Sequence, residues 1–462
     1  MKPLQENATI AGSAFMAQRS SWAGQRRISE GLSRTKTAVT AQRRPLVFGS
    51  ILVICWLYYY RPEDFITPLA YIPMAKIVGV FGFVALIAAM LSSSDLDVPR
   101  EIKLLWLLLV QMTICIPFAL WRTQAFSTTY GKYAKSVIAA MLISMSVVTL
   151  AQLRRLLWVQ LSAVALVTFL SIMTKHYNPD GRLAGIQDSI LSNPNDLAIN
   201  IAISFPICVA FILQAKVFKK LLWAAALAFM VLGVYLTESR SGLLALVISI
   251  MICVWQYGIK GKRTHVVVVT IAALVLGLGL ALSSTQYRAR VESIVLGNIE
   301  GSMDKGSREA RIKLMELSAM TAITHPVFGV GAGCFPLVDN TWKVAHNAYT
   351  EIAAESGMPA LILFLMVLAG AFRNVNQVKK SRLYAEDQET RLLTQALWAS
   401  LAAFLAGSIF ASTEYNLYPY LTVGYTCAML RITRQSSAQS KDRAPSTAMY
   451  ERKLGMQPVR SR

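Results

Sequence analysis

Three side chains in this sequence have the chemistry needed to act on a phosphate-linked substrate. Arg182 stands in DGRLAGIQ and Arg240 stands in TESRSGLLAL. A guanidinium stays charged at any working pH and binds phosphate oxygens through a planar fork of donors. His346 opens HNAYTEIAAESGMPALILFL, and a histidine with an ordinary pKa of about 6.5 can accept a proton at neutral pH. Together these residues predict anion binding beside a general base.

Each of these residues also has a simpler interpretation. Arg240 lies in a very short connection between two apolar stretches. If these stretches cross a membrane, an arginine at their junction either binds an anion or anchors a helix end by extending to the interface. Arg182 also fits an ordinary loop arginine, and His346 fits a polar residue at the interface. His325, which precedes Pro326, fits a structural turn.

The composition indicates that the surrounding elements lie in a membrane. Of 462 residues, 55% are hydrophobic and 15% are charged, whereas soluble domains carry about 25% charged residues. So little charge cannot cover the surfaces of the two or three soluble domains that this length would otherwise suggest. The same figures exclude a disordered chain, collagen and a disulfide scaffold. We therefore predict an all-α polytopic membrane protein.

Apolar runs long enough to cross a bilayer predict about twelve transmembrane helices. The predicted spans are 46–60, 75–93, 104–120, 132–150, 156–173, 196–214, 221–236, 242–257, 264–283, 347–371, 392–412 and 417–431. Nine of them fall in the region 46–283 and three in the region 347–431. No CxxC or Cys/His spacing among the six cysteines suggests a metal site.

Lysine and arginine mark the connections that are predicted to face the cytoplasm. The segment 1–45 is basic, and so is every short connection that follows an even-numbered span. Both termini are therefore expected in the cytoplasm, as the segments 1–45 and 432–462, which are predicted to be disordered. A net charge of +21 would suggest nucleic acid in a soluble protein. Here most of that charge follows from topology, and no nucleic-acid partner is expected.

The opposite, periplasmic face is predicted to carry the candidate residues. Its long loop, 284–346, is of a length that is usually functional. Within it, 308–323 has apolar residues at helical spacing, and HPVFGVGAGCFP then breaks that helix. The string GVGAGC is not a dinucleotide fingerprint, because no βαβ unit surrounds it. We interpret it as a flexible loop that lines a site.

Four strings in one order resemble the O-antigen ligase and polymerase superfamily of bacterial inner-membrane glycosyltransferases. They are GRLAGIQDSILSNPNDLA, ESRSGLLAL, REARIKLMELSAMTAITHPVFGVGAGCF and HNAYTEIAAESGMPALILFL. The resemblance implies a GT-C-like membrane fold and a donor glycan carried on polyprenyl pyrophosphate, without a metal or other cofactor. It implies an acceptor that is lipid A-core, a growing glycan or a protein, met at the periplasmic face of the inner membrane among the membrane lipids.

The resemblance also implies roles for individual residues. Arg182 and Arg240 match the two arginines that precede the long loop, where fixed guanidinium groups would stabilise a departing pyrophosphate. His346 matches the histidine at the end of the loop, and we expect it to be the base of an inverting single displacement. Arg311 matches the arginine that begins the loop helix, although Met315 stands where many members have tryptophan. The residues expected to position a substrate are Arg308, Arg311, Asn347 and Glu355.

Two alternatives to a ligase remain open. A polymerase or a protein glycan transferase would use the same donor chemistry with a different acceptor. A transporter of lipid-linked glycans would belong to a different class, whose members place ionisable groups at mid-membrane and often contain repeated halves. The unusual polar residues of this sequence gather on one predicted face instead, which favours an enzyme.

Overall fold

The computed structural model of this chain is helical. The residues that it describes are 45–60, 74–91, 98–179, 181–185, 191–263, 302–338 and 343–453. Within these ranges there is no strand, and a single isolated bridge joins Tyr177 to Leu183. The all-α class predicted from composition is therefore confirmed for the described part of the chain.

The helices follow the order of the predicted spans. They are α2 (Pro45–Tyr60), α4 (Met74–Leu91), α5 (Arg100–Cys115), η2 (Ile116–Phe118), α6 (Arg122–Phe126), η3 (Ser127–Tyr133), α7 (Ala134–Ser146), α8 (Leu150–Met173), α9 (Pro194–Gln214), α10 (Val217–Thr237), α11 (Arg240–Cys253), η4 (Val254–Ile259), α14 (Ser302–Thr324), η5 (Phe335–Leu337), α15 (Ala348–Lys379), α16 (Arg382–Glu386), α17 (Gln388–Gly407) and α18 (Leu417–Lys453). Every predicted span except 264–283 overlaps one of these helices, and 264–283 lies outside the described residues.

Six helices in the described part are long and apolar enough to cross a membrane. They are Arg100–Phe118, Leu150–Met173, Pro194–Gln214, Val217–Thr237, Arg240–Ile259 and Ala348–Lys379. A multi-pass membrane protein is therefore confirmed, whereas the count of about twelve spans, the GT-C-like assignment and the periplasmic place of the long loop stay predictions. The division of the chain at 45, 283, 346 and 431 stays a prediction as well.

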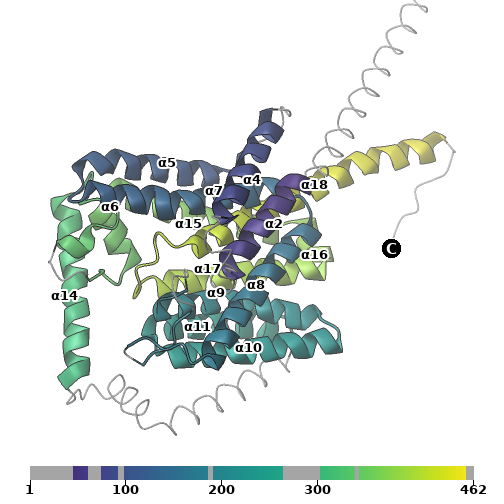
Figure 1. The fold of residues 1–462 in the computed structure, drawn as a ribbon. Coiled ribbons are helices and arrows are strands. Elements are labelled where there is room, and N and C mark those ends of the chain that lie inside the picture. Colours follow the sequence, from purple (N-terminus) through teal and green to yellow (C-terminus); the bar gives the residue numbers. More distant parts are fainter. Residues whose placement is uncertain are drawn as a thin grey trace, which may run out of the picture.

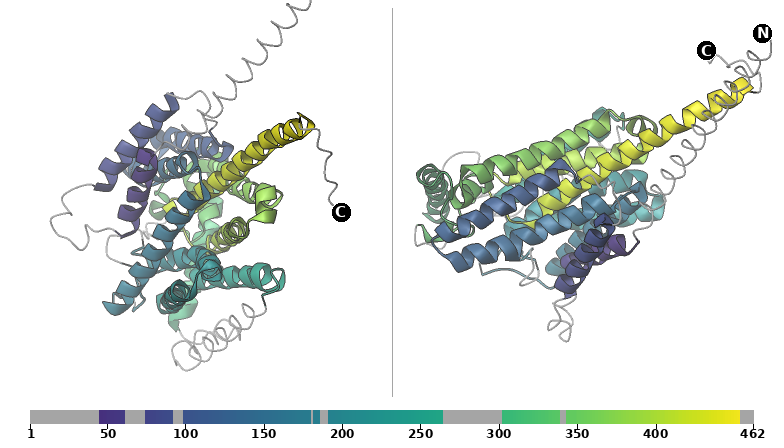
Figure 2. Two further views of the ribbon diagram at one scale, coloured as in Figure 1. Left: turned by 90° about the vertical axis from the view of Figure 1, so that its right-hand side faces the viewer. Right: turned by 90° about the horizontal axis from the view of Figure 1, so that it is seen from above.

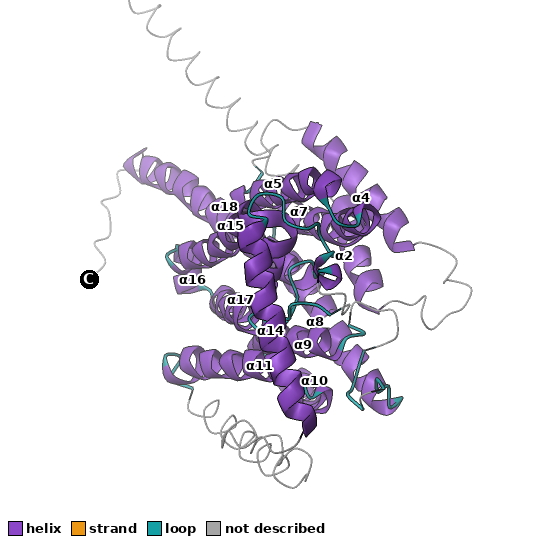
Figure 3. Ribbon diagram, turned by 90° about the vertical axis from the view of Figure 1, so that its left-hand side faces the viewer, coloured by secondary structure: helices purple, strands orange, loops and turns teal. Residues whose placement is uncertain are grey.

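The long helices lie side by side in a bundle, and α14 crosses one end of it (Figure 1, Figure 3). The far half of α18 projects from the opposite end (Figure 1, Figure 2). Helix α9 lies at the centre, packed against α8, α10, α11 and α17. On the other side of the bundle, α15 packs against α5, α17 and α18. The helix expected over 308–323 is therefore present as α14, and it begins at Ser302.

Small residues allow the central helices to approach closely. A Cβ atom on Gly242 of α11 would lie 2.1 Å from the Cβ of Ala198 in α9. A Cβ atom on Gly233 of α10 would lie 2.3 Å from the side chain of Thr168 in α8. Apolar helices in a membrane gain little from hydrophobic burial, so close van der Waals packing of this kind holds them together.

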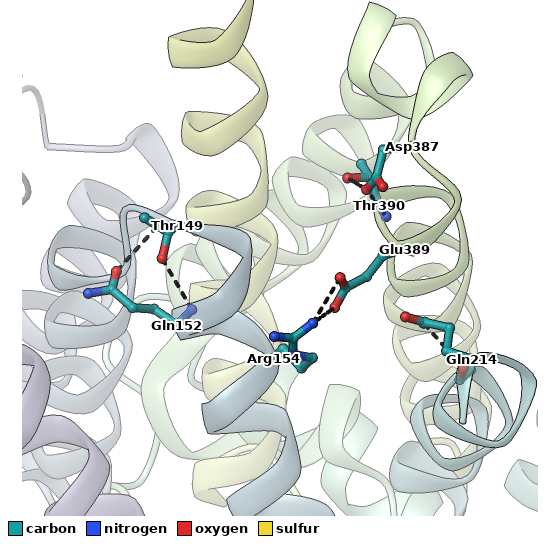
Figure 4. A network of polar contacts seen from close by, with 8 residues as sticks. Thr149, Gln152, Arg154, Gln214, Asp387, Glu389 and Thr390 are labelled. Carbon is teal, nitrogen blue, oxygen red and sulfur yellow. Dashed lines mark hydrogen bonds and ion pairs between the residues drawn. The ribbon is translucent and has the colours of Figure 1, made fainter. Parts of the chain in front are cut away.

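Helix ends away from α14 are joined by polar contacts (Figure 4). Thr149 and Gln152 form a capping box at the start of α8, and Asp387 caps α17 by accepting from the backbone N–H of Thr390 at 2.7 Å. Arg154 of α8 donates to Glu389 of α17 at 3.0 Å. These contacts fix the two helix starts beside each other.

Helix α15 is broken at Gly357, two residues before Pro359. Gly357 has φ 80° and ψ 170°, which is a conformation that side chains with a Cβ rarely adopt. The break frees backbone carbonyls, and in a membrane these need partners inside the protein. Gln111 of α5 supplies one of them by donating to the carbonyl of Ser356 at 3.1 Å.

Candidate functional site

His346 lies at the end of the bundle crossed by α14, directly before α15. Asn347 is the N-cap of α15, and its side chain accepts from the backbone N–H groups of Tyr349 and Thr350 at 2.9 and 3.0 Å. His346 itself has a left-handed backbone with φ 56°. Its backbone N–H donates to the hydroxyl of Ser412 at 3.1 Å. This contact holds a conformation that is costly for a residue other than glycine.

Positive charge surrounds the half-buried His346 side chain. Burial, followed by the charges of Arg311, Arg182 and Lys343, lowers the pKa of His346 to about 4. The ring is therefore neutral at neutral pH and keeps a lone pair that can accept a proton. These three cations come from different segments of the chain, so the fold brings Arg182 and Arg311 near His346.

Arg182 is held against the turn between α10 and α11. Its Nε donates to the carbonyl of Thr237 at 2.9 Å, and its Nη2 donates to the side-chain oxygen of Asn195 at 2.9 Å. Ser239 donates to the same oxygen of Asn195 at 2.8 Å and also caps α11. Arg240, the first residue of α11, is exposed at this turn. The side chain of Arg182 therefore reaches the turn where Arg240 begins α11, and the capped start of a helix stabilises anions.

Helix α14 brings Arg311 to the site by packing against α15. Ser318 of α14 donates to the hydroxyl of Thr350 at 2.7 Å. The amide of Asn347 donates to the sulfur of Met315 at 3.7 Å, so the methionine that departs from the family pattern lies at this contact. Arg308 belongs to the same helix, and its side chain lies outside the described residues.

Asn347 and Glu355 both have structural partners. The Asn347 oxygen caps α15, as described above. Glu355 is buried, and it accepts from the backbone N–H groups of Gly333 and Phe335 at 2.7 and 3.0 Å. It also accepts from the hydroxyl of Tyr415 at 2.7 Å. Glu355 therefore attaches the glycine-containing loop to α15, and a role for either residue in positioning substrate stays a prediction.

The loop interpreted as flexible is pinned to the break in α15. The backbone N–H groups of Val330 and Gly331 donate to the carbonyls of Ala354 and Glu355 at 2.9 and 2.8 Å. Gly331 has φ 102°, and a Cβ atom there would lie 2.3 Å from the side chain of Ala119. The glycines thus serve close backbone approach and satisfy the helix carbonyls, rather than mobility.

The sequence did not predict that the candidate Glu355 lies in a cluster of acidic residues. The buried Glu414 lies near Glu351, Glu355 and Asp196; burial, followed by the charges of Glu351 and Glu355, raises the pKa of Glu414 well above its usual range. Ser412 donates to the carboxylate of Glu351, and thereby links this group to the backbone of His346. We call Asp196, Glu351, Glu355 and Glu414 the acidic cluster. Charged residues at the edges of apolar runs were the available signal.

The cations around His346 could hold an anion. Among the described residues, no group of three or more His, Cys, Asp or Glu side chains is arranged to hold a metal ion. Arg182, Arg311 and Lys343, which lie in three segments of the chain, supply positive charge beside the His346 ring. This arrangement suits a substrate that contains phosphate and a hydroxyl to be deprotonated.

Comparison with known proteins agrees with the resemblance seen in the sequence. Residues 225–365 match the O-antigen ligase family, a range that contains Arg240, Arg311 and His346 but not Arg182. The chain is 26% identical to the exopolysaccharide production protein ExoQ of Rhizobium meliloti (strain 1021) over 357 residues, which is 72% of this chain and 78% of that relative. These two findings support a member of the O-antigen ligase-like superfamily.

Proposed function

We propose that this O-antigen ligase-like superfamily member is an inverting glycosyltransferase. It moves a glycan from a polyprenyl-pyrophosphate carrier to an acceptor hydroxyl, at the periplasmic face of the bacterial inner membrane, with both termini in the cytoplasm. The observation that carries the proposal is the neutral, half-buried His346 among Arg182, Arg311 and Lys343. A base next to fixed cations matches a reaction in which a hydroxyl attacks and a pyrophosphate leaves.

The arginines hold the leaving group in this mechanism. Arg182 and Arg240 stand at the turn that opens α11, and Arg311 approaches from α14. The bond between the anomeric carbon and the pyrophosphate oxygen breaks, and its electron pair leaves with the pyrophosphate. Guanidinium groups fixed before the reaction stabilise that developing charge without reorganising.

His346 receives the proton of the acceptor hydroxyl as the hydroxyl oxygen attacks the anomeric carbon from the opposite side. Without substrate, burial and then the surrounding cations lower the pKa of His346 and make it a weak base. A bound pyrophosphate offsets those charges, because an opposite charge nearby favours the protonated imidazole. Donor binding therefore strengthens the base at the moment it is needed.

The first experiment is the glycan profile of a strain that lacks the gene, complemented with wild type, His346→Ala or the matched control His325→Ala. His325 is exposed in a turn and bonds to Thr324 at 3.0 Å. We expect His346→Ala to lower transfer by about 100-fold or more while the protein is still made, and His325→Ala to restore the profile. Near-normal transfer by His346→Ala would show that the base is misassigned.

The same profile separates a ligase from a polymerase. Long lipid-linked chains that accumulate without reaching their acceptor indicate a ligase, and single repeat units on both lipid and acceptor indicate a polymerase. The polymerase is the second candidate, because the 26% identical relative is named as an exopolysaccharide production protein. If neither pool changes, glycan transfer is not the function, and a transporter has to be tested instead.

A further inference from the structure

One face of α5 indicates where the membrane lies near the site. Leu107, Val110, Ile114 and Phe118 are exposed and recur at helical spacing. Arg100–Phe118 is a candidate membrane span, so this apolar stripe faces lipid. Phe118 is its last member at the end of the bundle that carries α14.

The turn 325–328, between α14 and the glycine-containing loop, lies beside that stripe. The ring of Phe328 stacks on Phe118 with centroids 4.2 Å apart. The carbonyl of Val327 accepts from Gln111 at 2.8 Å. Gln111 precedes Phe118 by seven residues, which is about 10 Å along a helix. The turn therefore runs alongside the end of the Arg100–Phe118 span, from α5 at Gln111 to η2 at Phe118.

The turn also contacts the break in α15. The backbone N–H of Met358 donates to the carbonyl of Pro326 at 2.7 Å. Met358 begins a second exposed apolar stripe, continued by Ile362 and Leu365 on the membrane-spanning part of α15. The turn thus occupies the space between two helices whose outer faces both meet lipid.

The side chains of the turn continue these two stripes. Val327 is 51% exposed and Phe328 is 36% exposed, and Ile323, at the adjoining end of α14, is 71% exposed. Apolar side chains in water gain nothing from such exposure, whereas the same side chains in the bilayer interior are matched to their surroundings. Continuity with α5 and α15 identifies lipid, rather than another protein, as what covers them.

We propose that the turn 325–328 dips into the bilayer and that Val327 and Phe328 contact the acyl chains of membrane lipids. Through the bonds from the loop to Glu355 and α15, this contact sets the height of α14 and the His346 site relative to the membrane surface. The lipid contact does not depend on the proposed transfer reaction, so either idea can fail alone.

The test uses one introduced cysteine, because all six native cysteines are buried. Full-length Val327→Cys is labelled with an environment-sensitive fluorophore and reconstituted in phosphatidylglycerol and phosphatidylethanolamine vesicles. The matched control is Glu309→Cys, an exposed position near the other end of α14, and labelled wild type gives the background. Ile323→Cys serves as a second position if the first variant is recovered poorly.

We expect spin-labelled lipids to quench the Val327 label several-fold more strongly than the Glu309 label, and its emission to lie further to the blue. Aqueous iodide should show the reverse order. Equal access of iodide to both labels would overturn the proposal. So would a Val327 label that neither quencher reaches in a protein of twice the monomer mass, because a second copy of the chain would then cover the turn.

Discussion

The cations around His346 and the acidic cluster both lie near the start of α15, and they are built differently. Arg182, Arg311 and Lys343 converge on one half-buried ring from three segments. The acidic cluster is turned inward, and in it Glu355 accepts from two backbone N–H groups and a hydroxyl. In the first arrangement positive charge lies beside His346, whereas in the second the oxygens of Glu355 hold backbone N–H groups in place. The difference is consistent with the transfer role proposed for His346 and its cations, and it indicates a supporting role for Glu355.

Removing Glu355 should have the largest effect on the fold. Glu355→Ala leaves the N–H groups of Gly333 and Phe335 and the hydroxyl of Tyr415 without their acceptor. Each buried unsatisfied group costs about 1–3 kcal/mol, so we expect several kcal/mol of destabilisation, measured as a large fall in Tm in detergent. His346→Ala should leave the Tm close to that of wild type.

Glu355→Gln should destabilise the protein less than Glu355→Ala does. Its single carbonyl oxygen can serve only part of the three donors, so its Tm should fall between those of wild type and Glu355→Ala. If Glu355→Ala keeps a normal Tm but loses transfer, Glu355 takes part in the chemistry. The acidic cluster would then not be a purely structural support.

Candidate site residues were easier to select from the sequence than the contacts that support the fold. Apolar runs located the helices, and local strings located Arg182, Arg240 and His346, because the signal for each lies within its own segment. The contacts that support the fold join residues from distant segments, and no local sequence pattern predicts them. Asn416 donates to Asp196 at 2.9 Å across 220 positions of sequence.

The break in α15 also could not be predicted from the local sequence. Gly357 and Pro359 stand in the string SGMP, yet the apolar run continues past them, so 347–371 was predicted as one span. The structure continues the helix to Lys379 and breaks it at Gly357. What stabilises the break is the loop 329–335 and Gln111, and both lie far away in sequence.

Arg311→Gln should change the pH dependence of transfer. Removing one of the charges that depress the pKa of His346 raises that pKa from about 4 toward its ordinary value. The base acts only when neutral, and a higher pKa means that it becomes protonated at a higher pH. The acid limb of kcat/KM should therefore move to higher pH, together with a loss of about 10-fold at neutral pH.

Lys313→Gln is the matched control for Arg311→Gln. Lys313 is an exposed cation on the same helix and is not among the charges that act on His346. Its pH profile should coincide with that of wild type. If both variants shift the acid limb equally, the effect comes from the general field of α14, and Arg311 has no specific place beside the ring.

Substitution of Asn195 should have the smallest and most selective effect on transfer, because Asn195 holds Arg182 in place but carries no charge itself. Its oxygen accepts from Arg182 at 2.9 Å and from Ser239 at 2.8 Å. In Asn195→Ala, Arg182 keeps its bond to the carbonyl of Thr237, so we expect a several-fold rise in KM for the donor with kcat nearly unchanged. Asn195→Asp keeps the acceptor but adds a negative charge beside Arg182. If Arg182 binds the pyrophosphate, this variant should raise KM more than alanine does; if it restores wild-type KM, Arg182 only fastens the turn.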